Sequence, residues 1–537
     1  MSEAGAARVS APAAPAAGGG SPWLIASVVA LASFMEVLDT TISNVALPYI
    51  AGGMGVSQDE STWVVTTYLV SNSVILTASP FLARMMGRKR FFLSCLSLFT
   101  FSSLLCGFAW NLHSLLLFRI MQGLGGGGMV PVAQSILADS FPPEKRGQAF
   151  ALFGMSVVVA PIVGPTLGGW LSDNWSWHWC FLINGPVGVI AMALIYVLFN
   201  EPPRVAALRR RKQRESGGFD LVGFLLIATF LGALEVVLDR GLEDDWFSSR
   251  FIVVTSLICV GAFILAIPWE LTRRNPMIDL RLIGTRQFGA CFFVMLAVGM
   301  ILLGTTQIVP QLVQEQFGYT ALWAGLVLSP GGVFTMVMMV VVGRLISFVQ
   351  PKYLIVCGAA FIALSMHQLT RMFQGVDFWF FSDTRMILGV GLPMVFISIT
   401  TASYYGIPAD KTDQASAIIN AARNIGGSIG VALSANVLAH RSQFHQNMLV
   451  GNISPASPEY QTTLQKVTHY FILQGMSAVD AGQAAIGWIG KTIASQTALL
   501  AYIDVFQTMM VIALAVIPLA LSLRKIKLGK AAAGDAH

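Results

Sequence analysis

Charged residues are scarce in this sequence, and their scarcity excludes most soluble folds. Asp, Glu, Lys and Arg make up 11% of the 537 residues, whereas hydrophobic residues make up 55%. A soluble domain carries about 25% charged residues. The chain is therefore expected to be a polytopic membrane protein. Its net charge of +6 then indicates orientation in the membrane and not nucleic-acid binding.

Patterns for redox, metal and nucleotide chemistry are also missing. The six cysteines form no CxxC pair and lie in or beside apolar stretches, so we interpret them as packing residues. The run GGGG at 125–128 lacks the Lys and the Ser or Thr of a phosphate-binding loop. No HExxH string is present. Neither a cofactor nor ATP as the energy source is expected.

What the sequence does contain is a series of apolar stretches long enough to cross a bilayer. A hydrocarbon core of about 30 Å requires about 20 helical residues. Inside lipid, every backbone polar group needs a partner within its own segment, so these stretches are predicted to be helices. The fourteen expected spans are 23–48, 60–82, 91–109, 112–137, 148–170, 178–199, 219–239, 251–271, 287–312, 321–346, 353–372, 381–403, 414–439 and 498–522.

The order of the spans predicts an all-α membrane protein with two six-helix halves and two inserted helices. The expected divisions are a disordered cytoplasmic tail (1–22), an N-terminal half (23–199), a basic cytoplasmic linker (200–218), two inserted helices (219–271), a C-terminal half (287–522) with an exported segment (440–497), and a second cytoplasmic tail (523–537). Lys and Arg gather in alternate connections and in the last tail. By the positive-inside rule, both termini are expected in the cytoplasm.

A weak internal repeat relates the two halves. LDTTISNVALP in the first span resembles LGTTQIVPQL in the ninth. A second pair of strings, FRIMQGLGGGGMVP and TRMILGVGLPMV, places Arg119 opposite Arg385 and Gly123 opposite Gly389. Asp39, in contrast, aligns with Gly304. Parallel repeats are typical of transporters whose substrate binds between the halves near the membrane midplane. The halves are therefore expected to share a scaffold but not the carboxylate.

Three charged residues deep within spans are the candidates for proton coupling. Glu36 and Asp39 share one face of the first span because they are three residues apart. At 1.5 Å per residue, Arg119 and Asp39 lie at similar depths below the outer surface, so we expect them to meet. Carboxylates inside a membrane are costly and mark ion or proton paths. A permanent structural ion pair is the alternative.

Two further carboxylates, Glu235 and Asp239, lie toward the outer end of the seventh span. Because Asp239 is followed by Arg240, we interpret Asp239 and Arg240 as an interfacial pair, and a proton site is the alternative.

Polar and aromatic side chains on the central spans are candidates for contact with the substrate. Hydrogen bonding between helices is the alternative role. These candidates are Trp63, Tyr68, Asn72, Gln307, Gln311 and Arg423. The fifth span also contains the string APIVGPTLGG, in which small residues allow close helix packing and Pro bends the helix. The residues expected to do so are Gly164, Pro165, Gly168 and Gly169.

The segment 440–497 is longer than a connection between two spans requires. Its stretches 457–474 and 477–496 have helical apolar spacing, and Ser477 is a suitable N-cap. Amphipathic helices outside the membrane must cover their apolar faces. We expect these to rest on the bilayer surface, on the protein's own outer mouth or on a partner protein.

Together, these strings resemble the motifs of the fourteen-helix drug:proton antiporters of the major facilitator superfamily, particularly the EmrB type. LDTTISNVALP, LLLFRIMQGLG and APIVGPTLGG are similar to the family's first-, fourth- and fifth-helix motifs. PFLARMMGRKR (80–90) matches a family loop only partly, because Arg84 stands where Asp is usual. The resemblance covers nearly the whole chain. It adds Asn44 and Gln122 as cavity candidates, and Gly87, Arg88 and Gly123 as residues that accompany conformational change.

The resemblance implies a proton-coupled exporter of hydrophobic or amphiphilic small molecules that works by alternating access. It also implies a bacterial inner membrane, a periplasmic adaptor protein and an outer-membrane channel. An exporter of one endogenous lipid or metabolite, or an importer, remains an alternative. An integral membrane enzyme would need a catalytic or metal cluster at one membrane face. A channel is disfavoured because the two-fold symmetry is broken at Asp39.

Overall fold

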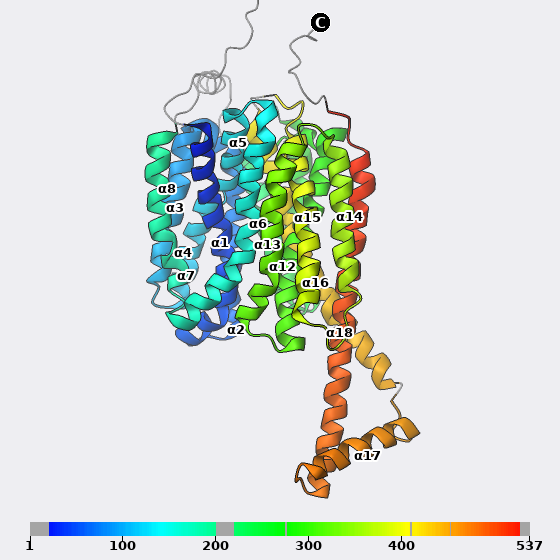
Figure 1. The fold of residues 1–537 in the computed structure, drawn as a ribbon. Coiled ribbons are helices and arrows are strands. Elements are labelled where there is room, and N and C mark those ends of the chain that lie inside the picture. The colour runs from blue at the N-terminus through cyan, green and yellow to red at the C-terminus, as the bar shows by residue number, and fades with distance from the viewer. Residues whose placement is uncertain (1–20, 200–219, 274–275, 409–410, 452, 527–537) are drawn as a thin grey trace, which may run out of the picture.

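The protein is a bundle of long helices that run roughly side by side, and the first described helix begins at the same end at which the last described helix finishes (Figure 1). The computed structural model describes residues 21–199, 220–273, 276–408, 411–451 and 453–526. Regular structure in these ranges is helical throughout. We call the end of the bundle at which the first helix begins and the last helix finishes the termini end, and the opposite end the arm end. The expected tail 1–22 and linker 200–218 lie almost wholly outside the described residues.

The N-terminal half consists of α1 (Pro22–Met54), α2 (Gln58–Met86), α3 (Arg88–Gly107), α4 (Leu112–Gly126), α5 (Met129–Ser140), α6 (Pro143–Asn174), α7 (Trp179–Leu182) and α8 (Asn184–Leu198). Two inserted helices follow, α10 (Leu221–Arg240) and α11 (Arg250–Thr272). The C-terminal half contains α12 (Arg286–Phe317), α13 (Ala321–Leu345), α14 (Pro351–Leu369), α15 (Phe378–Ser403), α16 (Thr412–Gly451), α17 (Pro458–Leu473) and α18 (Ala478–Leu521).

Each expected span coincides with a helix or with two consecutive helices. The fourth span is divided into α4 and α5, and the sixth into α7 and α8. By length and composition, twelve of the described helices can cross a membrane, and the bent α6 makes thirteen. The helix α16 is less apolar, but it packs between α12 and α18 in the bundle. By position, the fourteen expected spans are therefore present.

Close helix packing repeats in the two halves, as the internal repeat predicts. In the N-terminal half, a Cβ on Gly123 of α4 would lie 2.5 Å from the carbonyl oxygen of Tyr68 on α2. In the C-terminal half, a Cβ on Gly389 of α15 would lie 2.4 Å from the carbonyl oxygen of Gly331 on α13. Backbone atoms do not yield as side chains do. Glycine is therefore needed at both aligned positions for the helices to approach.

Replacing Gly123 with alanine is expected to destabilise the protein by about 1–3 kcal/mol, the usual range for overpacking a filled site. The added methyl group would force α2 and α4 apart near the buried charges of α1. The matched control is Gly261→Ala on α11, where an added Cβ meets nothing within 4 Å. Thermal unfolding of both variants in detergent tests this. Equal apparent unfolding temperatures would contradict the packing argument.

The two halves are joined at the termini end. Arg88 of α3 forms an ion pair with Asp413 of α16, 2.9 Å between Nε and Oδ1. Nearby, Asn420 of α16 donates to the Gln134 side chain of α5 at 2.7 Å. The Ser416 hydroxyl donates to the carbonyl of Pro131 at 2.8 Å. These bonds fasten the halves together at this end of the bundle.

At the arm end, the last helices extend well beyond the bundle (Figure 1). The continuation of α16, the whole of α17 and the first turns of α18 form this projection, which we call the arm (440–497). The helix at 457–474 agrees with α17, and the Ser477 hydroxyl caps α18 by accepting from the backbone of Asp480 at 3.2 Å. The stretch 477–496 was expected to be separate from the last span, but α18 is continuous. No Gly or Pro lies between Lys491 and Ile517, so nothing in the sequence ends the helix there.

Candidate proton-coupling site

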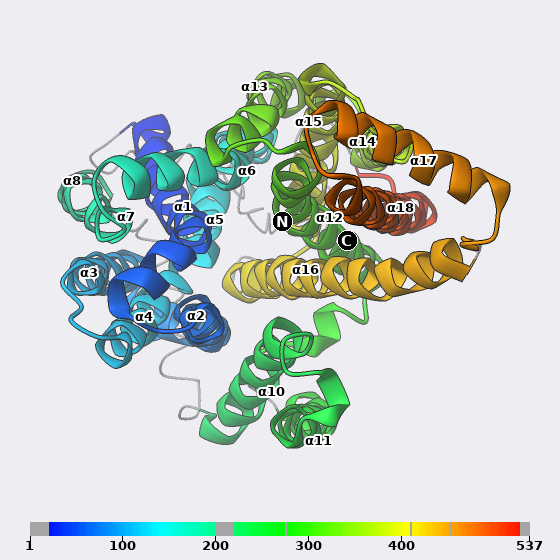
Figure 2. The ribbon, with the colours of Figure 1, turned by 90° about the horizontal axis from the view of Figure 1, so that it is seen from below.

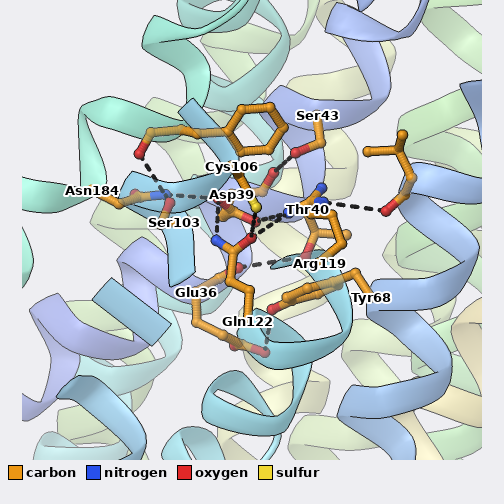
Figure 3. A network of polar contacts seen from close by, with 12 residues as sticks. Glu36, Asp39, Thr40, Ser43, Tyr68, Ser103, Cys106, Arg119, Gln122 and Asn184 are labelled. Atoms are coloured by element: carbon orange, nitrogen blue, oxygen red, sulfur yellow. Dashed lines mark hydrogen bonds and ion pairs between the residues drawn. The ribbon is translucent and has the colours of Figure 1, made fainter. Parts of the chain in front are cut away.

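Asp39 is enclosed by partners from two other helices of the N-terminal half (Figure 3). It lies near the middle of α1 and has no exposed surface. One carboxylate oxygen is 2.6 Å from Nη1 of Arg119 on α4. The other oxygen accepts from Gln122 at 2.9 Å and from Asn184 of α8 at 2.7 Å. The carboxylate is thus fully hydrogen-bonded in a position that water does not reach.

Arg119 is held as tightly as its partner. Its Nη1 also donates to the Gln122 side-chain oxygen at 2.8 Å, and its Nε donates to the carbonyl of Val64 at 3.2 Å. The guanidinium lies between two rings, 4.9 Å from the centroid of Tyr68 and 4.8 Å from that of Phe181. Both ion-pair side chains are 0% exposed. Loss of one charge from a desolvated pair of this kind leaves the other charge uncompensated.

Glu36 lies one turn before Asp39 and faces the other half of the molecule. Asn72 donates to its Oε1 at 3.0 Å, and the Tyr68 hydroxyl lies at 3.5 Å. The buried Oε2 has no hydrogen-bond partner among the described residues. Arg423 of α16 is close enough to interact electrostatically, and its own Nη1 also lacks a partner within the described ranges. Glu36 and Arg423 therefore form a charge pair between the halves, without direct contact.

Arg385, the arginine of the C-terminal half that aligns with Arg119, has no carboxylate partner in the described part of the chain. Arg385 of α15 is buried, and it donates to the carbonyl of Thr305 at 2.5 Å and to its hydroxyl at 3.3 Å. Thr305 follows Gly304, the residue that aligns with Asp39. The two arginines therefore occupy matching positions, but only Arg119 meets an acid.

The helix that carries Asp39 is seated against α6 by small residues. A Cβ on Gly164 would lie 2.0 Å from the Thr41 hydroxyl, and one on Gly168 would lie 3.2 Å from the backbone of Ile42. Beside them, α6 bends by 44° between its segments Lys145–Pro161 and Val163–Asn174. That bend is where Pro161 and Pro165 remove backbone hydrogen bonds. Gly169 is buried on the same helix.

Comparison with known proteins places this architecture in a family. A family profile described as "Major Facilitator Superfamily" matches residues 29–431, which include the Asp39 site and Arg385. The chain belongs to the major facilitator superfamily. It is 35% identical to "Multidrug export protein EmrB" of Escherichia coli (strain K12) over 481 residues, 89% of this chain and 90% of that protein. It is 34% identical to "Fatty acid resistance protein FarB" of Neisseria gonorrhoeae, over 94% of this chain and 96% of that protein.

A solved structure confirms the fold of this major facilitator. It is that of the proton:xylose symporter XylE, with a TM-score of 0.57 at 12% identity, covering 93% of this chain and 96% of that chain. At this identity the likeness concerns the fold alone. The expected EmrB-type resemblance and the major facilitator fold are both confirmed.

The other cavity candidates lie in different surroundings. Tyr68, Asn72 and Gln122 are part of the Asp39 and Glu36 network described above. Trp63 faces the inserted helices instead, with Arg240 stacked 5.1 Å from its ring centroid and Phe251 beside it. Gln311 donates to Glu315 on its own helix at 2.9 Å. Two candidates are exposed on helices of opposite halves, Asn44 on α1 and Gln307 on α12.

The partly matching loop holds a contact that the sequence alone did not predict. Gly87 has a φ of 90°, which lets α2 end and α3 begin within one residue. Arg88 then reaches two carboxylates, Asp139 of α5 and Asp413 of the other half. The Asp that the family usually has at Arg84 is absent from this loop, but Arg88 still has acidic partners from two other helices.

Asn184 is the site residue that the sequence reasoning missed. Its signal was a lone amide in the otherwise apolar string FLINGPVG. It now bridges Asp39 and the Ser103 hydroxyl, which lies at 3.0 Å. Gln122 was inferred from the family motif alone, and it contacts both members of the ion pair.

Two features of enzymes, a metal cluster and a serine nucleophile turn, are missing from the described residues. No group of three or more His, Cys, Asp or Glu side chains is arranged to hold a metal ion. The string GGSIG (426–430) has the spacing of a serine nucleophile motif, but it lies inside the continuous helix α16. The nucleophile motif requires a sharp strand-to-helix turn.

Proposed function

We propose that this protein exports hydrophobic or amphiphilic small molecules in exchange for protons. The observation that carries the proposal is the fully buried Asp39–Arg119 pair, present in one half and without a counterpart in the other. A carboxylate at this depth changes its charge only by binding a proton. That proton must be exchanged with one side of the membrane or the other as the halves rock. The printed names of the relatives, multidrug export and fatty acid resistance proteins, support substrates of this class.

Proton binding at Asp39 would weaken its attraction to Arg119 and free α1 to move against α4. Gln122 and Asn184 both donate to the same oxygen of Asp39, which can still accept from them as a carbonyl oxygen when the proton binds at the oxygen that faces Arg119. The contact between Arg88 and Asp413 holds the termini end closed in this conformation. Alternating access would require that contact to break while the arm end closes.

The charge pattern supports an orientation with both termini in the cytoplasm of a bacterial inner membrane. Lys and Arg cluster at the connections of the termini end. The arm would then project into the periplasm.

The experiment that tests the function is transport in proteoliposomes with an imposed pH gradient and a panel of lipophilic substrates. We expect accumulation of several unrelated lipophilic compounds against the direction of proton flow. Comparison of right-side-out with everted vesicles separates export from import. Transport of a single metabolite would favour the dedicated exporter, and transport that ignores the pH gradient would contradict proton coupling.

We also propose that the arm contacts a periplasmic adaptor protein, which would lead to an outer-membrane channel. Large apolar side chains on the arm are exposed to solvent, including Val479 and Leu473, each 73% exposed, and Ile486, 55% exposed. No other described helix covers this surface. Apolar area of this kind on a projecting element is typical of a protein interface.

Replacing Val479 and Ile486 together with Asp is expected to abolish drug resistance in cells and to leave transport in proteoliposomes unchanged. The charges would oppose burial in an interface without touching the bundle. The control is Thr462→Asp together with Thr463→Asp on α17, two exposed polar positions that receive the same added charge. Equal loss of activity in cells and in vesicles would assign the arm to the transporter's own gating or folding.

A further inference from the structure

The inserted helix α10 lies over the seam between the two halves. It packs against α2 of the N-terminal half and against α16 of the C-terminal half (Figure 2). Its neighbour α11 packs on α10, away from the bundle. Any movement of the halves against each other must therefore change at least one of the contacts of α10.

Two carboxyl groups of α10 hold these contacts. Glu235 and Asp239 are four residues apart, so they point from the same face of the helix. Glu235 is 2.7 Å from the Ser428 hydroxyl of α16, and Asp239 forms a hydrogen bond with the Thr66 hydroxyl of α2. The helix α10 is thus bonded to both halves through two acids. Neither acid is part of the Asp39 site.

The hydroxyl partners show which form of the acids fits. A serine or threonine hydroxyl has a single hydrogen to donate. The Ser428 oxygen also lies 3.2 Å from the carbonyl of Asn424, and the Thr66 oxygen lies 3.2 Å from the carbonyl of Thr62. If the acid is protonated, it donates to the hydroxyl oxygen, and the hydroxyl donates to its own helix. If the acid is ionised, one of these two contacts lacks a hydrogen. Both contacts of each hydroxyl are therefore satisfied at once only if the acid is protonated.

The surroundings of Glu235 also favour the neutral form. The residue is 6% exposed, and no cation of the described chain lies within ion-pair distance of it. The titratable group that faces it on its own helix is Asp239, so ionisation of both acids would place two like charges close together. On α16, Arg423 interacts with Glu36 instead. An isolated carboxylate in such a place is costly, so it exchanges its charge for a proton.

On α10 itself, Arg240 is already engaged. It pairs with Glu243 and Asp244 and stacks on Trp63 of α2. This arginine anchors the end of α10 to the N-terminal half. Glu235 is then left as the side chain that links α10 to the C-terminal half.

We propose that Glu235 is a second proton-binding site of the transporter, protonated when α10 is tied to α16. When Glu235 releases its proton, a charge is left in a buried position without a cation, so the ionised side chain leaves the seam for water and α10 moves with the N-terminal half. This inference rests on the proposed proton-coupled function. It gives the inserted helices a role in that function, because the contact of α10 with α16 would depend on whether Glu235 carries a proton.

The variants are chosen to keep the protein folded. Glu235→Gln keeps a donor for the Ser428 oxygen, because the side-chain amide replaces the acid hydroxyl, but it has no proton to release. Ser428→Ala removes the partner and leaves the acid. The matched control is Asp383→Asn on α15, which changes an exposed carboxylate.

The test is infrared spectroscopy of the full-length protein in lipid across a pH series, paired with transport driven by a pH gradient. In wild type we expect a carboxylic-acid carbonyl band that disappears as the pH rises. Glu235→Gln should remove part of that band and flatten the pH profile of transport, whereas Asp383→Asn should change neither. In Ser428→Ala, the band should disappear at a different pH.

An unchanged band in Glu235→Gln, or a pH profile identical to that of wild type, would overturn the inference. Failure of the proposed function gives a different result. Wild-type transport would then ignore the pH gradient, whatever the spectrum of Glu235→Gln shows.

Discussion

Asp39→Asn is expected to abolish transport driven by a pH gradient while substrate exchange at equal pH on both sides continues. Asparagine preserves the size of the side chain and its hydrogen bonds with Gln122 and Asn184, but it cannot bind a proton. The membrane potential supplies about 2.3 kcal/mol per charge for each 100 mV, and the variant cannot use this energy at the site. Counterflow and gradient-driven uptake in the same proteoliposomes measure the two activities separately.

The neighbouring acid provides the control for this prediction. Glu36→Gln keeps the bond from Asn72 through its amide oxygen and removes the charge that faces Arg423. It is expected to weaken transport or change the substrate range, with coupling intact. If Asp39→Asn still transports in response to the pH gradient, Asp39 is not the coupling residue.

Arg119→Ala is expected to be inactive and strongly destabilised. Removing one partner of a buried ion pair leaves an uncompensated charge and costs about 3–5 kcal/mol. The cavity between the rings of Tyr68 and Phe181 adds to this. Arg119→Lys should retain partial activity, because lysine keeps the charge but not the planar donor geometry.

A double variant separates charge from packing in the Arg119 prediction. Adding Asp39→Asn to Arg119→Ala removes the unpaired carboxylate, so part of the lost stability should return while transport remains absent. Thermal unfolding in detergent measures the stability of all four forms. An Arg119→Ala variant as stable and active as wild type would contradict the role assigned to the pair.

The helices and the central ion pair could be predicted because both depend on local properties of the sequence. Hydropathy over about 20 residues located every span. The depths of Asp39 and Arg119, counted from the span ends, indicated that they would meet, and they lie 2.6 Å apart. The repeat correctly aligned Gly123 with Gly389, because close packing imposes glycine at both positions.

The remaining contacts depend on how distant helices pack, which no local pattern encodes. Asp139 and Asp413 lie 51 and 325 residues from Arg88 in sequence. In the sequence, neither can be distinguished from an ordinary acidic residue near the end of a helix. Trp63 was expected at the central cavity, but its ring packs against Arg240 and Phe251 of the inserted helices. The bonds from α10 to both halves likewise follow from its position over the seam.

The most direct test of proton coupling is to measure protons released by the purified protein when a lipophilic substrate binds, in weakly buffered detergent solution. If Asp39 exchanges its proton for substrate, wild type should acidify the solution on substrate addition. Asp39→Asn should bind the substrate with a clearly smaller release. Substrate binding with no proton release from wild type, or with the same release from both forms, would contradict this coupling.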